Sequence, residues 1–509
     1  IYQESLQFYP EEIELYLRLS LALQDCGKTE AAIEIITQAS RLFANEISLK
    51  IEQIRIAPII YQSNEEIAFY RQRFTEGLTN LIEQLSLATI AERESAMRAI
   101  GWRTNFYLQY QGYNDLELQK KYGNFTHQVM AANYPDSVEK ITVPNLKGKG
   151  KIRVGYVSDC FHFHTVGLVF LGWLKNCDRT NFHISCYYIN NRSDDITKIF
   201  QIYSDRFYHI HDNLEAVAKQ IITDNLDILV FLDIGMFPQM TQLAALRLAP
   251  VQCAAWGHPI TSGLPTIDYF ISADLMEPAN AEEHYSEQLI KLSNIGISYS
   301  KPIISTPTKN RSDFNLRTDA VVYICCQSLF KYLPQYDYIF GAIAQQVPQA
   351  QFVFISHLPT PIIEQFRQRL QRAFANFNLH SEDYCIILPR QTQLDYWNLN
   401  LIADIFLDTF GFTGFLTTIE SIACNLPIVT CPGEFMRSRQ SYGILQRLGI
   451  AETIAQNEPE YIEIAVKLGL QSEWRHSIVE KIKHCQNILY DDKTCVAELE
   501  AFYRRLIQK

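Results

Sequence analysis

The chain has 509 residues, which is too long for a single compact core and predicts about three domains of roughly 100 to 200 residues each. Its hydrophobic share of 47% and charged share of 20% are those of an ordinary globular protein and exclude a disordered or fibrous chain. The net charge of -11 provides no uniform positive field for a polyanion, so we exclude general nucleic-acid binding and keep open a local site for a small phosphorylated ligand.

The spacing of the cysteines and the length of the apolar runs indicate the cellular compartment of the protein. The 12 cysteines are scattered, without the regular spacing of a disulfide-rich secreted domain and without a C-x-x-C pair that would hold zinc, which favours a reducing cytoplasm. No apolar run reaches the roughly 18 residues that a membrane span needs, and acidic side chains near the N-terminus argue against a signal peptide, so we expect no membrane partner. Because the chain begins with Ile1 rather than Met, we expect further sequence upstream.

Residues 13–44 predict a helical hairpin. Gly27 and Lys28 separate two stretches whose apolar residues recur at helical spacing. The pattern resembles one tetratricopeptide unit of about 34 residues, and because one unit cannot bury its own faces we expect more repeats upstream. We assign residues 1–60 to a tetratricopeptide-like domain; a helical cap without a binding role is the alternative. The apolar positions are Tyr16, Leu19, Leu23, Ala32, Ile36 and Ala39.

Residues 61–150 predict a helical linker region without evident chemistry. Two apolar stripes support the helices. From Lys147 to Lys151 lysines alternate with Gly148 and Gly150, a run that has nothing apolar to bury and predicts a flexible linker. We therefore expect a new domain from residue 151. The stripes are formed by Tyr70, Phe74, Leu78 and Leu81, and then by Phe106, Leu108, Tyr110 and Leu116.

From residue 151 onward, short β-branched runs alternate with helical stretches, which predicts parallel α/β sheets. Pro302 and Pro307, among polar neighbours, mark a break between two such series. We predict two Rossmann-like domains, 151–305 and 306–509, the second with terminal helices. They face one another across a cleft, and ligands bind there beyond the carboxyl ends of the strands. The expected strands are 152–157, 183–189, 226–232, 251–255 and 269–272, then 321–325, 351–355, 384–388, 405–407 and 427–430.

Three loops after predicted strands carry candidate site residues. Residues 256–265, Trp-Gly-His-Pro-Ile-Thr-Ser-Gly-Leu-Pro, either present backbone N–H groups to a ligand or form a plain turn. Lys331 lies shortly after the first strand of the second domain, where its ammonium either meets a diphosphate or remains a solvated surface charge. Residues 411–418 follow a strand and open a helix, a place that favours phosphate, or they form a tight turn without a ligand.

Two histidines and one tyrosine are further candidates. His162 and His164 follow the first strand of the first domain, and histidine suits proton transfer near pH 7. A metal site at this H-x-H pair lacks further ligands at recognisable spacing, and a plain packed or exposed histidine is the other alternative. Tyr396 has an aromatic ring that either stacks on a nucleotide base or fills the core.

The chain resembles the O-linked N-acetylglucosamine transferase/SPINDLY family through motifs that stand in the family's order and cover about residues 150–509. The resemblance implies a GT-B fold, with the acceptor on the first Rossmann-like domain, the nucleotide sugar on the second, and front helices that help bind protein substrates. It implies that helix termini and cations stabilise the leaving diphosphate, so we predict no cofactor and no catalytic metal at Asp233 or Asp268. Besides loop 256–265, the motifs are Ile267-Asp268-Tyr269, His284-Tyr285-Ser286-Glu287, Gln327-Ser328-Leu329-Phe330-Lys331, Leu407-Asp408-Thr409, Thr417-Thr418-Ile419-Glu420 and Pro432-Gly433-Glu434.

The resemblance also implies roles for individual residues. His164 matches the family's histidine beside the reaction centre, where it serves as general base or orients the donor, and Lys331 matches the phosphate-binding lysine; we predict both to be catalytic. Glu420 is expected to accept hydrogen bonds from ribose hydroxyls. The predicted substrate-binding residues are His258, Pro259, Thr261, Ser262 and Gly263, and the predicted nucleotide-binding residues are Gln327, Ser328, Lys331, Tyr396, Gly414, Thr417, Thr418 and Glu420.

We therefore expect inverting transfer of a sugar from a nucleotide diphosphate sugar to a Ser or Thr hydroxyl of a protein. UDP-N-acetylglucosamine is the first donor candidate and GDP-fucose the second, and the helical repeats are expected to hold the protein acceptor. The family usually has polar residues such as His near the turn at 411–418, where this chain has Phe415 and Leu416. This departure keeps open a rival from another class, a protein-binding scaffold with a degenerate transferase domain.

Overall fold

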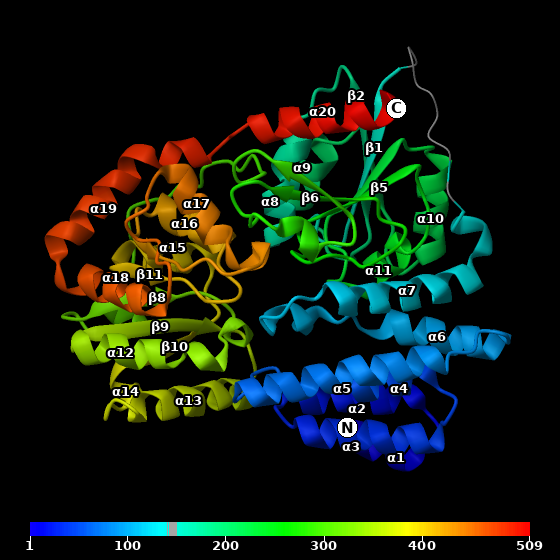
Figure 1. Cartoon of the computed structure of the whole chain (residues 1–509), viewed down its shortest axis with the longest axis horizontal. Coiled ribbons are helices and arrows are strands. Elements are labelled where there is room, and N and C mark those ends of the chain that lie inside the picture. Colours follow the sequence, from blue (N-terminus) through cyan, green and yellow to red (C-terminus); the bar gives the residue numbers. More distant parts are fainter. Residues whose placement is uncertain (140, 142–149, 509) are drawn as a thin grey trace.

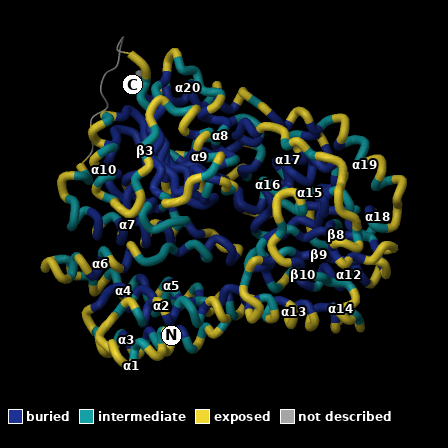
Figure 2. Tube along the Cα trace, turned by 180° about the vertical axis from the view of Figure 1, so that it is seen from behind, coloured by how far each residue is buried: buried dark blue, intermediate teal, exposed yellow. Residues whose placement is uncertain are grey.

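The computed structural model describes residues 1–139, 141 and 150–508. It contains two parallel sheets flanked by helices, beside a stack of N-terminal helices (Figure 1). Figure 2 shows that buried residues concentrate in the two sheets and the helices against them. The predicted α/β class is confirmed. Lys147, Gly148 and Lys149 of the predicted linker lie outside the described residues.

The N-terminal helices pack in sequence order. The second and third helices meet at Gly27, whose φ of 72° lies in the left-handed region that favours glycine. Tyr16, Ala32 and Ile36 form a small core between them, which confirms the predicted helical hairpin. The front comprises α1 (Tyr2–Phe8), α2 (Ile13–Asp25), α3 (Thr29–Leu42), α4 (Ile47–Arg55), α5 (Asn64–Glu83), α6 (Ile90–Trp102), the 3-10 helix η1 (Phe106–Tyr110) and α7 (Leu116–Asn133).

The first sheet has seven strands in the order β3-β2-β1-β4-β5-β6-β7. Every residue of β4 and β5 is buried, as expected for parallel strands covered on both faces. The five predicted strands are confirmed, whereas the edge strands β3 and β7 were missed because they are short, partly exposed and interrupted by polar or charged residues. The strands are β1 (Ile152–Ser158), β2 (Phe182–Tyr188), β3 (Arg206–His209), β4 (Ile228–Phe231), β5 (Val251–Ala255), β6 (Tyr269–Ala273) and β7 (Gln288–Leu292), with helices α8 (Thr165–Lys175), α9 (Asp195–Ile202), α10 (Leu214–Thr223) and α11 (Pro238–Ala244).

The second sheet has five strands in the order β10-β9-β8-β11-β12. All five correspond to strands that the sequence predicts. They are β8 (Val321–Cys325), β9 (Ala350–Ser356), β10 (Cys385–Pro389), β11 (Ile405–Leu407) and β12 (Ile428–Val429). The accompanying helices are α12 (Tyr338–Gln346), α13 (Thr360–Ala375), α14 (Ser381–Tyr384), α15 (Gln393–Ile402), α16 (Leu416–Ala423), α17 (Gln440–Leu448), α18 (Glu458–Leu470) and α19 (Ser472–Cys485).

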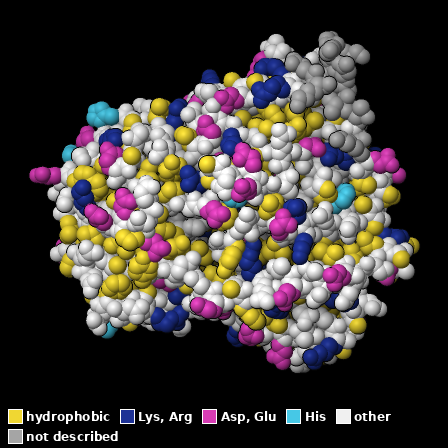
Figure 3. All heavy atoms as spheres, in the orientation of Figure 1, with side chains coloured by type: hydrophobic (Ala, Val, Ile, Leu, Met, Phe, Trp, Pro, Cys, Tyr) yellow, Lys and Arg dark blue, Asp and Glu magenta, His cyan; other side chains and the backbone are white. Residues whose placement is uncertain are grey.

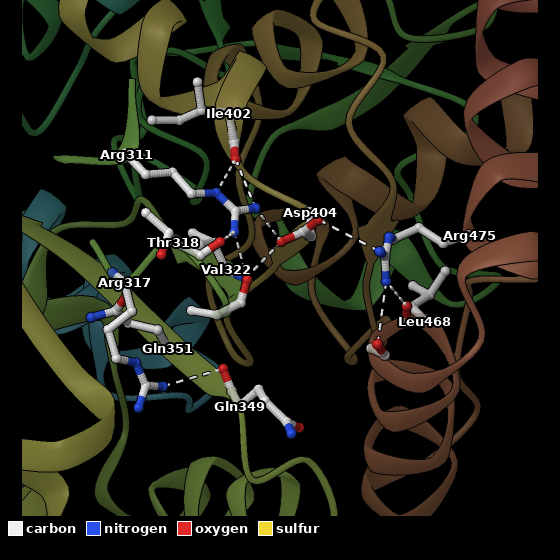
Figure 4. A network of polar contacts seen from close by, with 12 residues as sticks. Arg311, Arg317, Thr318, Val322, Gln349, Gln351, Ile402, Asp404, Leu468 and Arg475 are labelled. Atoms are coloured by element: carbon white, nitrogen blue, oxygen red, sulfur yellow. Dashed lines mark hydrogen bonds and ion pairs between the residues drawn. The ribbon is translucent and has the colours of Figure 1, made fainter. Parts of the chain in front are cut away.

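A half-buried polar network joins the amino ends of β8 and β11 (Figure 4). Asp404 accepts a hydrogen bond from Arg311 at 2.8 Å and one from the backbone N–H of Val322 at 2.8 Å. Arg475 of α19 forms an ion pair with the same carboxylate at 3.6 Å. These contacts lie at the edge of the sheet away from the carboxyl ends of its strands. We therefore assign them to the stability of the second domain.

The last helix, α20 (Thr494–Gln508), crosses back from the second domain to the first sheet (Figure 1). The Tyr503 hydroxyl lies 3.3 Å from that of Tyr156, and Glu500 accepts a hydrogen bond from the backbone N–H of Asp178 at 2.6 Å. The predicted domain limits remain a prediction, but this terminal helix packs on the first sheet. The side chain of Tyr503 is buried against Tyr156, so α20 covers part of the first sheet with its apolar face.

The front helices contact both α/β halves. Buried Arg369 of α13 donates to the backbone carbonyl of Tyr61 at 2.8 Å and pairs with Asp337. His127 of α7 donates to the carbonyl of Ala245 at 2.9 Å. On the face drawn in Figure 3, acidic and basic side chains are interspersed. The helical front is thus joined to both sheets.

Candidate active site

A cavity of about 270 Å³ lies where loops from both α/β halves meet η1. The loops after β1 and β5 reach it from the first sheet, and those after β8 and β11 reach it from the second, as expected for ligand sites at the carboxyl ends of parallel strands. The sequence-predicted residues in its wall are His164, His258, Pro259, Gln327, Ser328, Lys331 and Thr417.

Lys331 ends the 3-10 helix η5 (Leu329–Lys331) and lines this cavity. Its ammonium donates a hydrogen bond to Gln327 Oε1 at 2.9 Å and lies 4.2 Å from the ring centroid of Phe412. Burial lowers the pKa of Lys331 to about 8, and the negative charge of Asp408 opposes the shift. An ammonium has three N–H donors, so it can still bind an anionic ligand. Its surroundings are those of a cavity cation rather than of a solvated surface lysine.

Residues 411–417, called here the phosphate turn, lead from β11 into α16. Asp408 accepts hydrogen bonds from the backbone N–H of Gly414 at 2.8 Å and from Thr430 at 2.7 Å, which fixes the turn from below. A Cβ at Gly414 would lie 2.5 Å from Thr417 Oγ1, so the turn needs glycine there. No side chain caps the start of α16 among the described residues, which leaves its first N–H groups free for an anion.

His164 caps the amino end of α8. Its Nδ1 accepts a hydrogen bond from the backbone N–H of Val166 at 3.2 Å, so the neutral ring carries its proton on Nε2. Burial lowers the pKa of His164 to about 4, and the nearby His162 adds to the shift. The side chain is therefore a neutral hydrogen-bond donor near pH 7. His162 is buried and bonded to Tyr188 at 2.9 Å, and it is absent from the cavity wall.

His258 also lines the cavity, and its unpaired ring nitrogen is suited to accept a hydrogen bond, whereas that of His164 donates one. Its ring stacks on Phe106 with a centroid distance of 5.7 Å, and burial lowers its pKa to about 3, opposed by a hydrogen bond to the backbone of Ile234. Nε2 is buried and has no hydrogen-bond partner within the described part of the chain. A Cβ at Gly235, where φ is 91°, would lie 2.5 Å from His258 Nδ1. The imidazole therefore lines the cavity and has a buried Nε2 that is left unpaired.

Three predicted substrate-binding residues do not line the cavity. Thr261 donates to Glu287 at 2.6 Å, and the backbone N–H of Ser262 donates to the same carboxylate at 2.8 Å. Gly263 lies so close to the backbone of Gln119 on α7 that any side chain would collide. These residues fix the shape of the loop that presents His258.

The other predicted nucleotide residues lie beside the cavity. The Tyr396 hydroxyl approaches the carbonyl of Thr417 at 3.5 Å. Glu420 accepts a hydrogen bond from Gln393 at 3.3 Å, and burial raises the pKa of its carboxyl. Thr418 is buried against Ser441 at 2.7 Å and supports the turn from inside. The structure thus brings Tyr396 and Glu420 next to Thr417, outside the cavity wall, and leaves Thr418 in the core.

Comparisons with known proteins place this site in a family. The profile described as glycosyl transferase family 41 matches residues 135–299 and 291–499, more than half of the chain. The chain belongs to glycosyl transferase family 41. The expected resemblance to the O-linked N-acetylglucosamine transferase/SPINDLY family is confirmed.

Relatives with curated names support the same placement. The family 41 chain is 27% identical over 370 residues to the probable UDP-N-acetylglucosamine–peptide N-acetylglucosaminyltransferase SPINDLY of Solanum lycopersicum, and 24% identical over 408 residues to the probable transferase SEC of Arabidopsis thaliana. The alignments cover 69% and 77% of this chain but only 38% and 41% of those relatives.

A solved structure supports the fold. A mutant of the Thermobaculum terrenum O-GlcNAc transferase superposes with a TM-score of 0.76, covering all of this chain and 93% of that one at 22% identity. The predicted GT-B arrangement with a helical front is therefore confirmed. No helix in the described residues is long and apolar enough to cross a membrane. Within the same residues, no group of three or more His, Cys, Asp or Glu side chains is placed to hold a metal, and the expected absence of a catalytic metal remains a prediction.

Several wall residues of this family 41 site were missed from the sequence. Phe106 and Tyr110 come from the helical region, in front of the family match. Phe412 and Phe415 come from the phosphate turn, and Phe415 packs edge-on against Trp256 at 4.7 Å across the two α/β halves. The sequence predicts a helix without evident chemistry for the stripe at 106–110. Its density of aromatic side chains in a short 3-10 helix is the signal that could have indicated a cavity wall.

Proposed function

We propose that this family 41 chain transfers a sugar from a nucleotide diphosphate sugar to a Ser or Thr hydroxyl of a protein with inversion. The observation that supports this proposal most directly is that Lys331, the uncapped start of α16 and two neutral histidines meet in one cavity. The names of the curated relatives support UDP-N-acetylglucosamine as the first donor candidate. GDP-fucose stays the second candidate, as the family resemblance implies.

The second domain stabilises the leaving group in this proposal. As the bond between the sugar and the diphosphate breaks, its electron pair passes to the departing phosphate oxygen. The Lys331 ammonium and the free N–H groups of the phosphate turn face that growing charge. Preorganised donors of this kind act most strongly where charge develops in the transition state. Glu420 and Tyr396 are then close enough to the turn to contact the nucleoside.

In this proposal, the two histidines of the first domain have different roles in the cavity. His164 carries its proton on Nε2, so it is suited to orient an oxygen of the donor by donating a hydrogen bond. His258 has an unpaired Nε2 that can accept a hydrogen bond from the attacking hydroxyl and so orient it. A general base must lie within hydrogen-bond reach of the proton that it removes. This division favours donor orientation over base catalysis for His164.

Nucleotide binding tests the proposal. We expect UDP or GDP to bind this chain in calorimetry and binding to be lost in Lys331→Ala, because the diphosphate then lacks its cation. With peptide acceptors followed by mass spectrometry, the same substitution should lower turnover about a hundredfold. Unchanged turnover in Lys331→Ala would refute the assignment of Lys331. Failure of both nucleotides to bind the unaltered chain would favour a protein-binding scaffold.

The proposal includes the cellular compartment of the enzyme and the segment that binds its acceptor. All twelve cysteines are free in the structure, which supports a reducing cytoplasm. We infer that the helical front holds the protein acceptor, supported by its contacts with both α/β halves. Whether the front helices are tetratricopeptide repeats remains a prediction.

A further inference from the structure

We propose that Tyr110 is a positioning residue for Lys331, so that the helical region in front of the family 41 match supplies part of the donor site. Tyr110 lies at the end of η1, whereas the family match begins at residue 135. The inference rests on the proposed function in one respect, namely that Lys331 meets the donor diphosphate. It assigns a role to a segment whose sequence shows no chemistry of its own.

Two aromatic rings, those of Tyr110 and Phe412, lie near the ammonium, and Phe330 packs against Tyr110; we call the three rings the aromatic box. The ring of Tyr110 lies 4.8 Å from that of Phe330 and 4.9 Å from that of Phe412. Lys331 Nζ lies 6.0 Å from the Tyr110 centroid and 4.2 Å from the Phe412 centroid. The rings come from η1, from the segment after β8 and from the phosphate turn. They meet only in the folded chain.

The box acts on the lysine in two ways. Aromatic faces attract a cation within about 6 Å, which holds the flexible side chain in one place. The rings also keep water from the ammonium, and this burial accounts for the lowered pKa of Lys331. Within the described residues, Gln327 is its hydrogen-bond partner. An ammonium with little water around it gains more from an incoming diphosphate than a solvated one does.

Tyr110 is itself held firmly. It is only 7% exposed, and the adjacent Gln111 donates to the Tyr61 hydroxyl at 2.7 Å. Further along, Asp115 forms an ion pair with Arg437 of the second domain at 3.2 Å. The backbone carbonyl of Arg437 accepts from the N–H of Thr413 in the phosphate turn at 2.8 Å. The segment that carries Tyr110 is therefore bound to the turn that carries Phe412.

Charged and titratable groups near Lys331 come from several elements. Asp408 lies behind it at the end of β11, and its charge favours the ammonium form. His164 at the start of α8 and His258 after β5 line the same cavity, and both are neutral near pH 7 because burial lowers their pKa values to about 4 and about 3. Above pH 7, the proton lost in this cavity is accordingly that of Lys331.

Two measurements on the full-length chain test Tyr110. The first is the rate at which acetic anhydride labels Lys331 as a function of pH, followed by mass spectrometry, which reports the lysine titration without any nucleotide. The second is the Kd of UDP and of GDP by calorimetry. The variants are Tyr110→Phe, which keeps the ring, Tyr110→Ala, and Tyr110→Leu, which keeps most of the buried volume and removes only the aromatic face. Tyr122→Ala is the matched control, because Tyr122 is 5% exposed in the same helical region but is absent from the cavity wall.

We expect Tyr110→Phe to behave like the unaltered chain. Tyr110→Ala should raise the labelling midpoint of Lys331 by about half a pH unit or more, because water then reaches the ammonium. Tyr110→Leu keeps the burial and loses the attraction of the ring for the cation, so its midpoint should not rise. Both variants should also weaken nucleotide binding about tenfold, while Tyr122→Ala leaves both quantities unchanged. The inference is overturned if Tyr110→Ala keeps the normal midpoint, if neither Tyr110→Ala nor Tyr110→Leu weakens nucleotide binding, or if Tyr122→Ala has the same effects as Tyr110→Ala. If neither nucleotide binds the unaltered chain but the midpoint still responds to Tyr110, the proposed function fails while the positioning of Lys331 by Tyr110 stands.

Discussion

At the scale of single residues, the state of Lys331 controls the donor site. Its pKa of about 8 means that the side chain is mostly charged at pH 7 and loses its charge as the pH rises through 8. A neutral amine does not attract a diphosphate. We therefore expect the affinity for UDP to fall by up to about tenfold between pH 7 and pH 9.

Lys331→Arg is the control for this pH dependence. A guanidinium stays protonated throughout the range, so the affinity of this variant should not decline with pH, even if its absolute value is lower. Calorimetric titrations at closely spaced pH values provide the measurement. A flat profile in the unaltered chain, or an equal decline in the arginine variant, would contradict the role assigned to the lysine.

At the scale of elements, the phosphate turn depends on the carboxylate beneath it. In Asp408→Asn, one of the two acceptor oxygens becomes an NH₂ group and meets the N–H of Gly414 or the hydroxyl of Thr430, which are both donors. We expect the turn to shift and the affinity for UDP to fall about tenfold, because one buried donor loses its partner.

Asp404→Asn is the matched change at the opposite edge of the same sheet. It weakens the contacts with Arg311 and Arg475 and should lower the Tm (Figure 4). Because it lies away from the turn, it should leave the affinity for UDP unchanged. Calorimetry and thermal unfolding of both variants separate loss of the site from loss of stability, and an equal loss of affinity in both would argue against Asp408 as the support of the turn.

At the scale of the whole molecule, α20 fastens the second domain to the first sheet. Tyr503 is 2% exposed and contacts both Tyr156 and Phe182. We expect Tyr503→Ala to lower the free energy of unfolding by about 3 to 5 kcal/mol, as for other buried aromatic truncations. Urea unfolding measures the change, with Phe8→Ala as control because Phe8 is 75% exposed. A loss below about 1 kcal/mol would show that α20 is a loose appendage.

Much of the fold could be predicted because buried parallel strands have a local signature. β4 is a continuous apolar run and β5 is interrupted only by Gln252, and such short runs indicate strands wherever they stand in the chain. The edge strand β3 has exposed Arg206 and His209 at its ends, so its pairing with β2 determines its structure. Likewise, β7 has exposed Gln288 and Lys291, and it forms a strand through its pairing with β6.

Part of the candidate site could also be predicted, because some of its residues stand in local sequence motifs. His164, His258 and Lys331 stand in short motifs directly after strands, and all three reach the cavity. Thr261 stands in the same loop as His258, but its hydroxyl is bound to Glu287, a contact that spacing along the chain does not reveal.

The sequence by itself determined the order of helices and buried strands, the glycines of the turns and the membership of family 41. These features depend on neighbours along the chain, through hydrophobic periodicity and backbone conformation. Only the tertiary structure decided that Tyr110 and Phe412 surround Lys331, that His164 and His258 present opposite polarities, and that α20 lies on the first sheet. Those outcomes depend on contacts between distant segments, where burial and hydrogen bonding set the charge of a side chain and the direction of its donors.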